Sequence, residues 1–266
     1  MKQRVISAIV ALIICIPLLL IGGGLYDLGV IILSLLGLRE FLKAREHKKE
    51  LPIFINFISY IILVLIVITG VKTNDMVFAI DFRIIAALSM VFLIPVVLYH
   101  DRKLYSITDA FYLIGGIFFL GTSFSLFIII RNISLLLVIY LFTITIITDT
   151  YAYIMGRLVG RHKLLESISP NKTWEGMIFG TLFGTLIASV FYLVAININA
   201  HFIVVILMTL FLSIIGQFGD LVFSAIKRYF NIKDFSNIMP GHGGILDRLD
   251  SIIFVMLGFI FFISIL

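Results

Sequence analysis

The chain has 266 residues, of which 61% are apolar, and its mean hydropathy is +1.18. A soluble domain of this size needs more polar surface, so the composition excludes that class and indicates an integral membrane protein. The formal net charge is +5, and the single cysteine, Cys15, excludes an intrachain disulfide.

Apolar stretches long enough to cross the roughly 30 Å hydrocarbon core of a bilayer recur along the whole chain. We predict an all-α, polytopic membrane protein with about nine transmembrane helices. These helices are expected near residues 4–22, 25–41, 52–70, 84–100, 108–130, 133–155, 175–197, 201–219 and 250–266.

The distribution of basic residues predicts the orientation, because Lys and Arg collect on the cytoplasmic side of a bilayer. With the N-terminus inside, 17 of the 20 Lys and Arg residues fall in cytoplasmic segments. The remaining three are Lys72, Arg83 and Arg131. We therefore expect a cytoplasmic N-terminus, a C-terminus on the outer side, and a multi-pass protein of the cytoplasmic membrane.

One polar stripe lies at the end of the eighth expected helix. If that helix continues past the membrane surface, Asp220, Ser224 and Lys227 share one face, with Arg228 at its edge. A carboxylate and two cations suit a metal-bound polyphosphate, since the acid can hold the cation and the basic groups the phosphates. An interfacial helix whose Lys and Arg bind anionic lipid explains the stripe equally well.

The stretch MPGHGGILDRLDS, residues 239–251, shifts this balance toward a phosphate site. Its glycines allow positive φ and close backbone approach, and successive N–H groups in such a loop can bind an anion. Asp247 and Asp250 lie one turn apart at the start of the last helix, where acids also stabilise the helix dipole. If Asp220 lies nearby, these carboxylates need a divalent cation such as Mg²⁺. His242 is a candidate phosphate contact, with a plain loop hydrogen bond as the alternative.

A second polar segment, residues 148–175, contains an acid inside an expected span. Asp149 is costly at that depth, so it is either functional or paired, for example with Arg157. The run SPNKTWE follows, in which Ser169 or Thr173 can cap the next helix. Lys172 at a helix N-terminus is well placed for a phosphate.

Together these residues resemble a known signature. The pattern from Ser224 to Asp250 is SAIKR, four residues, KD, five residues, then PGHGG, two residues and DRLD. It resembles the signature of the phosphatidate cytidylyltransferases (CDP-diacylglycerol synthases) over 27 residues, and the run from Asp149 through SPNKTWEG is also similar to that family. Met239 departs from the usual Leu, Ile or Phe, which is a volume-conserving change.

The resemblance implies a reaction of phospholipid synthesis. CTP and phosphatidic acid give CDP-diacylglycerol and pyrophosphate, with Mg²⁺ required and a second cation plausible. It implies N-terminal helices at 1–132 that form a scaffold and give lipid access, and a catalytic half at 133–266. It also implies membrane lipids and a second copy of the chain, in a homodimer, as partners. No nucleic-acid partner is expected.

The resemblance also assigns roles to individual residues. It places Asp220 and Asp247 at the metal, with Lys227 and Asp250 as further catalytic residues. The implied substrate-binding residues are Asn171, Lys172, Ser224, Arg228, Lys233, His242, Gly243, Gly244 and Arg248.

Two other functions fit parts of the sequence. A CTP-dependent lipid kinase has similar chemistry but attacks the γ-phosphorus and releases CDP. An ion-coupled transporter would scatter polar residues through several spans, often in paired halves. Here the polar residues cluster at the expected cytoplasmic ends of the C-terminal spans, which favours nucleotidyl transfer.

Overall fold

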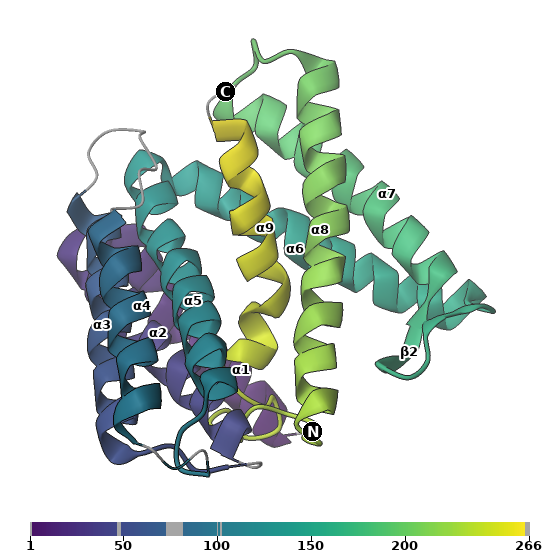
Figure 1. Ribbon diagram of the computed structural model, residues 1–266. Helices are drawn as coiled ribbons and strands as arrows, with labels where there is room; N and C mark the ends of the chain where they lie inside the picture. The colour runs from purple at the N-terminus through teal and green to yellow at the C-terminus, as the bar shows by residue number, and fades with distance from the viewer. Residues whose placement is uncertain (1, 47–48, 73–81, 100, 102, 264–266) are drawn as a thin grey trace. The chain divides into compact units, whose positions relative to one another are not determined.

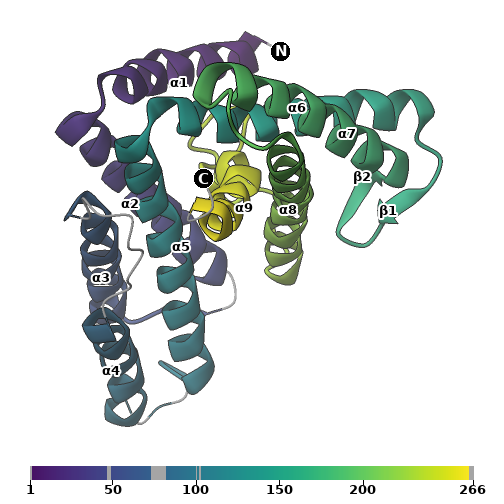
Figure 2. The ribbon, with the colours of Figure 1, turned by 90° about the horizontal axis from the view of Figure 1, so that it is seen from above.

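A computed structural model describes residues 2–46, 49–72, 82–99, 101 and 103–263 (Figures 1 and 2). Most of these residues are helical. The N-terminal helices are α1 (Lys2–Ile21), α2 (Gly23–Glu46), α3 (Ile53–Lys72), α4 (Phe82–Leu98) and α5 (Ile107–Ile133). The later helices are α6 (Leu135–Val159), α7 (Trp174–Phe191) with a π-helical extension η1 (Tyr192–Ile196), α8 (Phe202–Tyr229) and α9 (Leu246–Ile263).

Each expected helix coincides with one of these elements, and most ends agree to within about three residues. The second and sixth expected helices end four or five residues too early, since α2 continues to Glu46 and α6 to Val159. Two other differences affect the site. The eighth continues well past residue 219 to Tyr229, which is the extension that the polar stripe required. The ninth begins at Leu246, ahead of residue 250, so that Asp247 is inside its first turn. Residues 264–266 of the ninth expected span lie outside the described residues.

A short hairpin interrupts the helices and was not predicted. Strands β1 (Lys163–Leu165) and β2 (Ser169–Thr173) pair antiparallel, with Lys163 opposite Thr173 and Leu165 opposite Ser169. Neither strand alternates apolar and polar residues, because the hairpin has little core to cover. Its stability comes from backbone pairing and from the helix that follows it.

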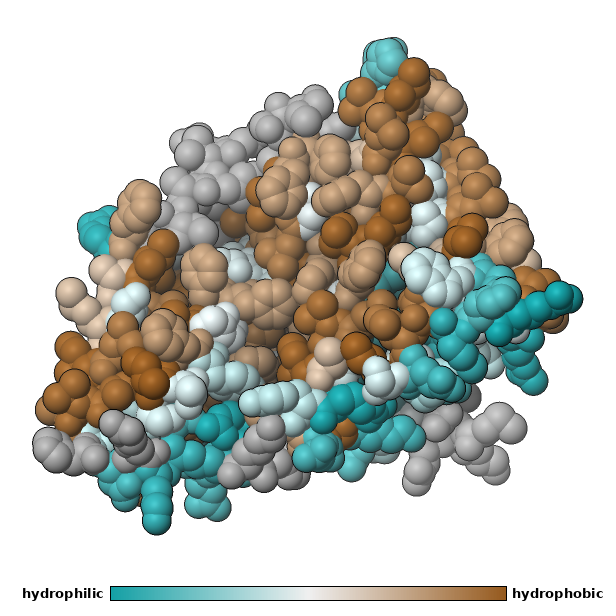
Figure 3. Space-filling view, turned by 45° about the vertical axis from the view of Figure 1, so that its right-hand side comes forward, coloured by the Kyte–Doolittle hydropathy of each residue, from teal (hydrophilic) through white to brown (hydrophobic). Residues whose placement is uncertain are grey.

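In the part of the chain that the structure describes, four helices are long and apolar enough to cross a membrane: α5, α6, α7 with η1, and α8. Large apolar side chains are exposed on their surfaces and on those of the shorter apolar helices, for example Leu158, Leu182 and Ile13. Figure 3 shows broad areas of such residues on one face of the molecule. Exposed apolar surface of this extent indicates a lipid-facing, multi-pass membrane protein.

The chain forms two compact units that are interleaved in sequence. The first unit contains residues Met1–Ile129 and Asp234–Leu246, and the second contains Ile130–Lys233 and Asp247–Leu266. The signature is therefore shared, because its middle belongs to the first unit and its two ends to the second.

In the second unit, small residues bring α6 and α7 into close contact. A Cβ atom at Gly176 would lie 2.6 Å from the Ala152 carbonyl oxygen, and one at Gly180 would lie 2.7 Å from that of Thr148. Small residues spaced by four allow membrane helices to pack this closely. The hydroxyl of Thr148 also lies 2.8 Å from that of Ser213, which ties α6 to α8. This packing fixes the helix that carries Asp149.

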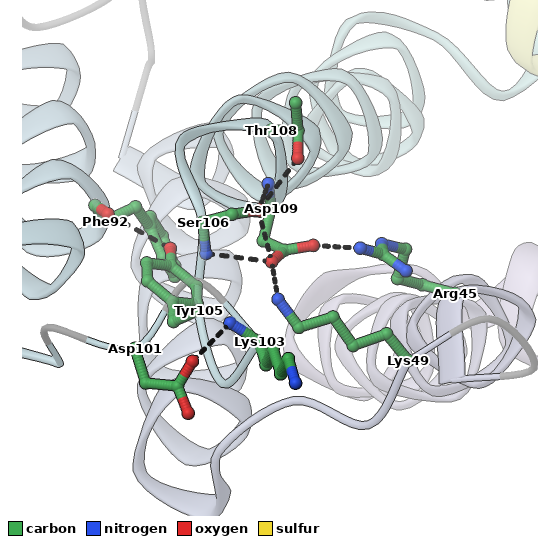
Figure 4. Close-up of polar contacts among 9 residues, drawn as sticks. All are labelled: Arg45, Lys49, Phe92, Asp101, Lys103, Tyr105, Ser106, Thr108 and Asp109. Atoms are coloured by element: carbon green, nitrogen blue, oxygen red, sulfur yellow. Dashed lines mark hydrogen bonds and ion pairs between the residues drawn. The ribbon is translucent and has the colours of Figure 1, made fainter.

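In the first unit, a buried charge cluster joins α2 to α5 (Figure 4). Asp109, in the first turn of α5, is fully buried and forms ion pairs with Arg45 and, at 2.6 Å, with Lys49. It also accepts hydrogen bonds from the backbone N–H (2.9 Å) and the hydroxyl (2.7 Å) of Ser106. Figure 4 shows both basic side chains directed at the carboxylate. All of these donors are needed, because a buried carboxylate without partners is strongly unfavourable.

Candidate active site

The stripe predicted on α8 exists in the second unit, and its acid is paired with a lysine from the hairpin. The Lys172 Nζ atom lies 2.6 Å from Oδ2 of Asp220, and Ser224 donates a hydrogen bond of 3.2 Å to Oδ1. Lys172 is placed by its neighbour Thr173, whose hydroxyl caps α7 by accepting the Gly176 N–H at 3.1 Å. The expected capping role of Thr173 is therefore confirmed.

A second lysine on α8 is paired with the first acid of α9. The Lys227 Nζ atom lies 2.7 Å from Oδ1 of Asp247. Their side chains are 10% and 5% exposed, whereas those of Lys172 and Asp220 are 27% and 30% exposed. The second unit thus holds two lysine–aspartate pairs, of which one is buried and one is accessible to solvent.

Two further carboxylates surround these pairs. Asp149 on α6 interacts with the side chain of Ser251 on α9 and electrostatically with Asp220 and Lys172. Asp250 on α9 interacts electrostatically with Asp220, Lys227 and Asp149. Three helices, α6, α8 and α9, therefore bring acids into mutual range.

The partner considered for Asp149 was wrong. Arg157 is exposed, and the groups that interact with Asp149 are Ser251, Asp220 and Lys172 instead. Asp149 therefore belongs to the site, although the site residues implied by the signature did not include it. The signal that identifies it is an ionisable residue within an otherwise apolar span.

These carboxylates have the donor chemistry of a Mg²⁺ site, because hard cations prefer carboxylate oxygens and several negative charges in one place require a cation. In this structure the cations are ammonium groups, on Asp220 from Lys172 and on Asp247 from Lys227. Among the described residues no three His, Cys, Asp or Glu side chains are already arranged around a common metal position. The carboxylate oxygens are therefore suitable ligands for Mg²⁺, and in this structure the two lysine ammonium groups neutralise them.

The other predicted residues of the second unit lie on its surface. Arg228 is exposed and donates to two carbonyl oxygens, that of Ile168 in the hairpin turn at 3.4 Å and that of Ile232 at 3.2 Å. Its guanidinium thus links the end of α8 to the hairpin. The side chains of Asn171, Lys233 and Arg248 are also at least partly exposed.

Three predicted residues, His242, Gly243 and Gly244, belong to the first unit, in the glycine loop (residues 239–246). The loop closes on itself, because the Met239 N–H donates to the Gly243 carbonyl at 3.0 Å and the Gly243 N–H to that of Met239 at 3.1 Å. Gly241 and Gly243 have φ values of 78° and 86°, which favour glycine. Gly244 has no positive φ, so a different constraint applies there.

Two N-terminal residues that the sequence analysis did not single out contact this loop. The Ser7 hydroxyl lies 2.7 Å from Nδ1 of His242 and donates to the Pro240 carbonyl at 3.1 Å. Glu40 accepts hydrogen bonds from Ser236 and from the backbone N–H groups of Ile245 and Leu246. Glu40 follows Arg39 at the charged end of an expected span, so its position in the sequence gives no specific signal of this contact.

Comparisons with known proteins agree over nearly the full chain. The sequence model of the cytidylyltransferase family matches residues 2–266. The chain is 40% identical over 257 residues to a protein of Staphylococcus haemolyticus (strain JCSC1435) named phosphatidate cytidylyltransferase, covering 96% of each chain. It is 39% identical to the protein of that name from Staphylococcus aureus (strain COL) and 38% identical to that from Staphylococcus epidermidis (strain ATCC 12228 / FDA PCI 1200), again over 96% of each chain.

Proposed function

The chain belongs to the cytidylyltransferase family, and on that premise we propose that it is a phosphatidate cytidylyltransferase. It transfers the cytidylyl group of CTP to phosphatidic acid and releases pyrophosphate, and the product is CDP-diacylglycerol for phospholipid synthesis. The observation that carries the proposal is the 40% identity over 96% of the chain to a protein of that name. The paired lysines and aspartates of the second unit supply chemistry that suits this reaction.

The reaction brings two anions together. A phosphate oxygen of phosphatidic acid attacks the α-phosphorus of CTP, and the bond from that phosphorus to the pyrophosphate oxygen breaks. Charge neutralisation and in-line positioning are the main requirements. Lys172 and Lys227 supply the charge: each binds an aspartate in this structure, and each can bind a phosphate oxygen when substrate arrives.

We propose Asp220 and Asp247 as the residues that hold Mg²⁺ once their lysines bind phosphate. An ion bound there neutralises phosphate oxygens and makes the α-phosphorus more electrophilic. Asp250 and Asp149 supply nearby carboxylates, which suit a second cation. The role of the protein is to keep these acids together on α6, α8 and α9, where their repulsion favours binding of a cation.

The remaining predicted residues are proposed either to bind the substrates or to position the groups that do. Asn171, Arg228, Lys233 and Arg248 present polar or basic groups at the surface of the second unit, where they can attract CTP. Ser224 orients the Asp220 carboxylate through its hydrogen bond. The glycine loop has an indirect role in this proposal, because His242, Gly243 and Gly244 determine its shape and its place beside the first acid of α9.

We further propose nine membrane spans, a cytoplasmic N-terminus, a C-terminus on the outer side and a place in the cytoplasmic membrane. The support is the 17 to 3 division of Lys and Arg, which puts the signature on the side where CTP is present. A homodimer, by resemblance to the family, completes the proposal.

The position of the transferred label tests this function. Purified protein in detergent is incubated with phosphatidic acid, Mg²⁺ and CTP labelled at either the α- or the γ-phosphate. We expect lipid-soluble label from the α-labelled CTP only, and released pyrophosphate. Transfer of the γ-label to lipid would instead identify a lipid kinase, and no transfer of either label would contradict both enzymes. The Asp247→Asn variant is the inactive control.

A further inference from the structure

Glu40 is a buried acid of the first unit, and no described residue of the chain provides it with a basic partner. It lies in α2 and is 1% exposed. Among the described residues no Lys, Arg or His forms an ion pair with it, in contrast to Asp109 of the same unit, which has two (Figure 4). A buried charge is strongly unfavourable unless hydrogen bonds or opposite charges compensate it. The donors around Glu40 must therefore do so.

All of those donors come from residues 234–246. The Ile245 N–H donates to Oε1 and the Leu246 N–H to Oε2, both at 2.9 Å, and the Ser236 hydroxyl donates to Oε1 at 2.5 Å. Leu246 is the first residue of α9. The first N–H groups of a helix have no partner within the helix and carry partial positive charge, so they bind anions. Here that anion is the protein's own carboxylate.

The close approach of Gly244 to Glu40 also indicates that the loop is built around this carboxylate. A Cβ atom at this position would lie 2.5 to 2.6 Å from Oε1, Cδ and Oε2 of Glu40, which is closer than real contacts allow. The backbone there does not have a positive φ, unlike that of Gly243 at 86°. Gly244 is therefore needed for space rather than for conformation. The group that occupies this space is Glu40.

A second contact holds the loop from α1. The Ser7 hydroxyl lies within hydrogen-bond distance of two loop groups, Nδ1 of His242 at 2.7 Å and the Pro240 carbonyl at 3.1 Å. The loop is thus bound at Pro240 and His242 by α1, and at Ile245 and Leu246 by α2. Within the first unit, the contacts from α1 and α2 therefore hold the loop in position, and we call this set of contacts the seat of the loop.

We propose that Glu40 is a positioning residue for cytidylyl transfer, which seats the glycine loop and fixes the peptide directly before Asp247. Leu246, whose N–H donates to Glu40, is covalently joined to Asp247, so Glu40 binds the residue that directly precedes the first acid of α9. The inference rests on the proposed function. It assigns the N-terminal half a part in the reaction, although the signature itself lies at residues 224–250.

The first test compares Glu40→Gln with Glu46→Gln, a matched substitution on the same helix. Glu46 is exposed and accepts only a 3.3 Å hydrogen bond from Asn56 among the described residues. In Glu40→Gln an NH2 group replaces one of the two carboxylate oxygens, so either the Ile245 or the Leu246 N–H loses its acceptor. We therefore expect kcat to fall about 10- to 100-fold with KM for CTP changed much less, the scale of a lost charged hydrogen bond. The control should match the wild type. A kcat for Glu40→Gln within twofold of the wild type would overturn the proposal.

Amide hydrogen exchange provides a readout that needs no substrate. In Glu40→Gln the peptide containing residues 243–247 should exchange faster, while peptides from α6 and α8 keep their wild-type rates. Unchanged exchange at 243–247 would contradict the seat. If the peptide 243–247 exchanges faster in Glu40→Gln but the wild-type protein transfers no label from CTP, the proposed function is wrong and the structural role of Glu40 is still supported.

A double-mutant cycle separates the seat from a phosphate contact and does not depend on the stability of Glu40→Gln. Gly244→Ala is measured alone and together with Glu40→Asp, which keeps the charge and withdraws the carboxylate by one methylene. If Glu40 fills the space, Gly244→Ala lowers kcat at least about tenfold in the wild-type background but less than about twofold with Glu40→Asp. An equal loss in both backgrounds would mean that Gly244 makes room for a substrate phosphate, and would overturn the proposal.

Discussion

The Lys227 Nζ atom and Oδ1 of Asp247 lie 2.7 Å apart, with both side chains largely removed from solvent. Lys172 and Asp220 form a pair of nearly the same length, 2.6 Å, but about three times as exposed on the lysine side. The N···O distances do not distinguish the two pairs, but their exposure to solvent does. Exposure matters because a charge left alone in a buried site is far less stable than one that water can reach. The two lysines should therefore respond differently to substitution.

For the buried pair, Lys227→Met should lower both stability and activity. It removes the Lys227 ammonium from a carboxylate that is 5% exposed, and removing one partner of a buried ion pair costs about 3–5 kcal/mol. Adding Asp247→Asn removes the buried charge, so the double variant should regain much of the lost thermal stability while turnover stays absent. Melting in detergent and α-label transfer measure the two effects. A double variant no more stable than Lys227→Met would contradict the ion-pair assignment.

For the accessible pair, Lys172→Ala should lower activity and leave stability nearly unchanged. Exposed ion pairs contribute only about 0–1 kcal/mol to stability. Loss of a charged hydrogen bond to a phosphate should weaken catalysis by about 1.5–3 kcal/mol. The Mg²⁺ dependence should keep its wild-type shape, because the metal ligands are intact. If Lys172→Ala needs a much higher Mg²⁺ concentration for activity than the wild type, Lys172 organises the metal-binding acids rather than binding phosphate.

Gly243 should be sensitive to any side chain. Its φ of 86° is strained for residues with a Cβ atom, so Gly243→Ala should destabilise the loop by about 1–2 kcal/mol, and Gly243→Val by more. Activity should fall in the same order. Exchange of the amide hydrogens of residues 239–243 reports the loop directly. Full activity of the Val variant with an unchanged melting temperature would show that the Met239–Gly243 turn is not required.

Asp109→Asn tests whether the buried cluster of the first unit is structural. Arg45 and Lys49 would lose their shared carboxylate, so we expect a loss of stability of about 3 kcal/mol, with kcat of the folded protein unchanged. Asp101→Asn is the matched control, because Asp101 is exposed and its carboxylate accepts a local hydrogen bond from the Lys103 N–H (Figure 4). A selective loss of kcat in Asp109→Asn would indicate a direct role in the reaction.

Cysteine labelling tests the orientation. Single cysteines are introduced into the segments 42–50, 156–173 and 228–248 in a Cys15→Ala background, and intact cells are treated with an impermeant thiol reagent. The division of basic residues predicts that all three segments are protected until the membrane is opened. Efficient labelling of 228–248 from outside would contradict the orientation and the cytoplasmic site. Positions 47 and 48 are avoided, since they lie outside the described residues.

The helices were predictable because a membrane span is a long-range compositional signal, which tolerates errors of a few residues at each end. The face shared by Asp220, Ser224 and Lys227 was also predictable, since helical periodicity alone determines it. The hairpin at residues 163–173 was not, because short polar strands lack the alternation that identifies a strand.

The partners of the site residues were beyond the sequence. Which lysine meets which aspartate depends on the packing of α8 against β2 and α9, and no local pattern distinguishes Lys172–Asp220 from the alternatives. The glycines illustrate the same limit. Positive φ at Gly243 follows from loop chemistry, but the need for space at Gly244 comes from Glu40, about 200 residues earlier in the chain.

The interleaving of the two units limits how this chain can be divided. A fragment of residues 130–266 contains every acid proposed to bind metal, yet its segment 234–246 would lack the helices it packs with in the first unit. Such a fragment is not a minimal enzyme. A chimera that exchanges the N-terminal half between relatives must bring residues equivalent to Ser7 and Glu40 with it, so the two halves are expected to change together during evolution.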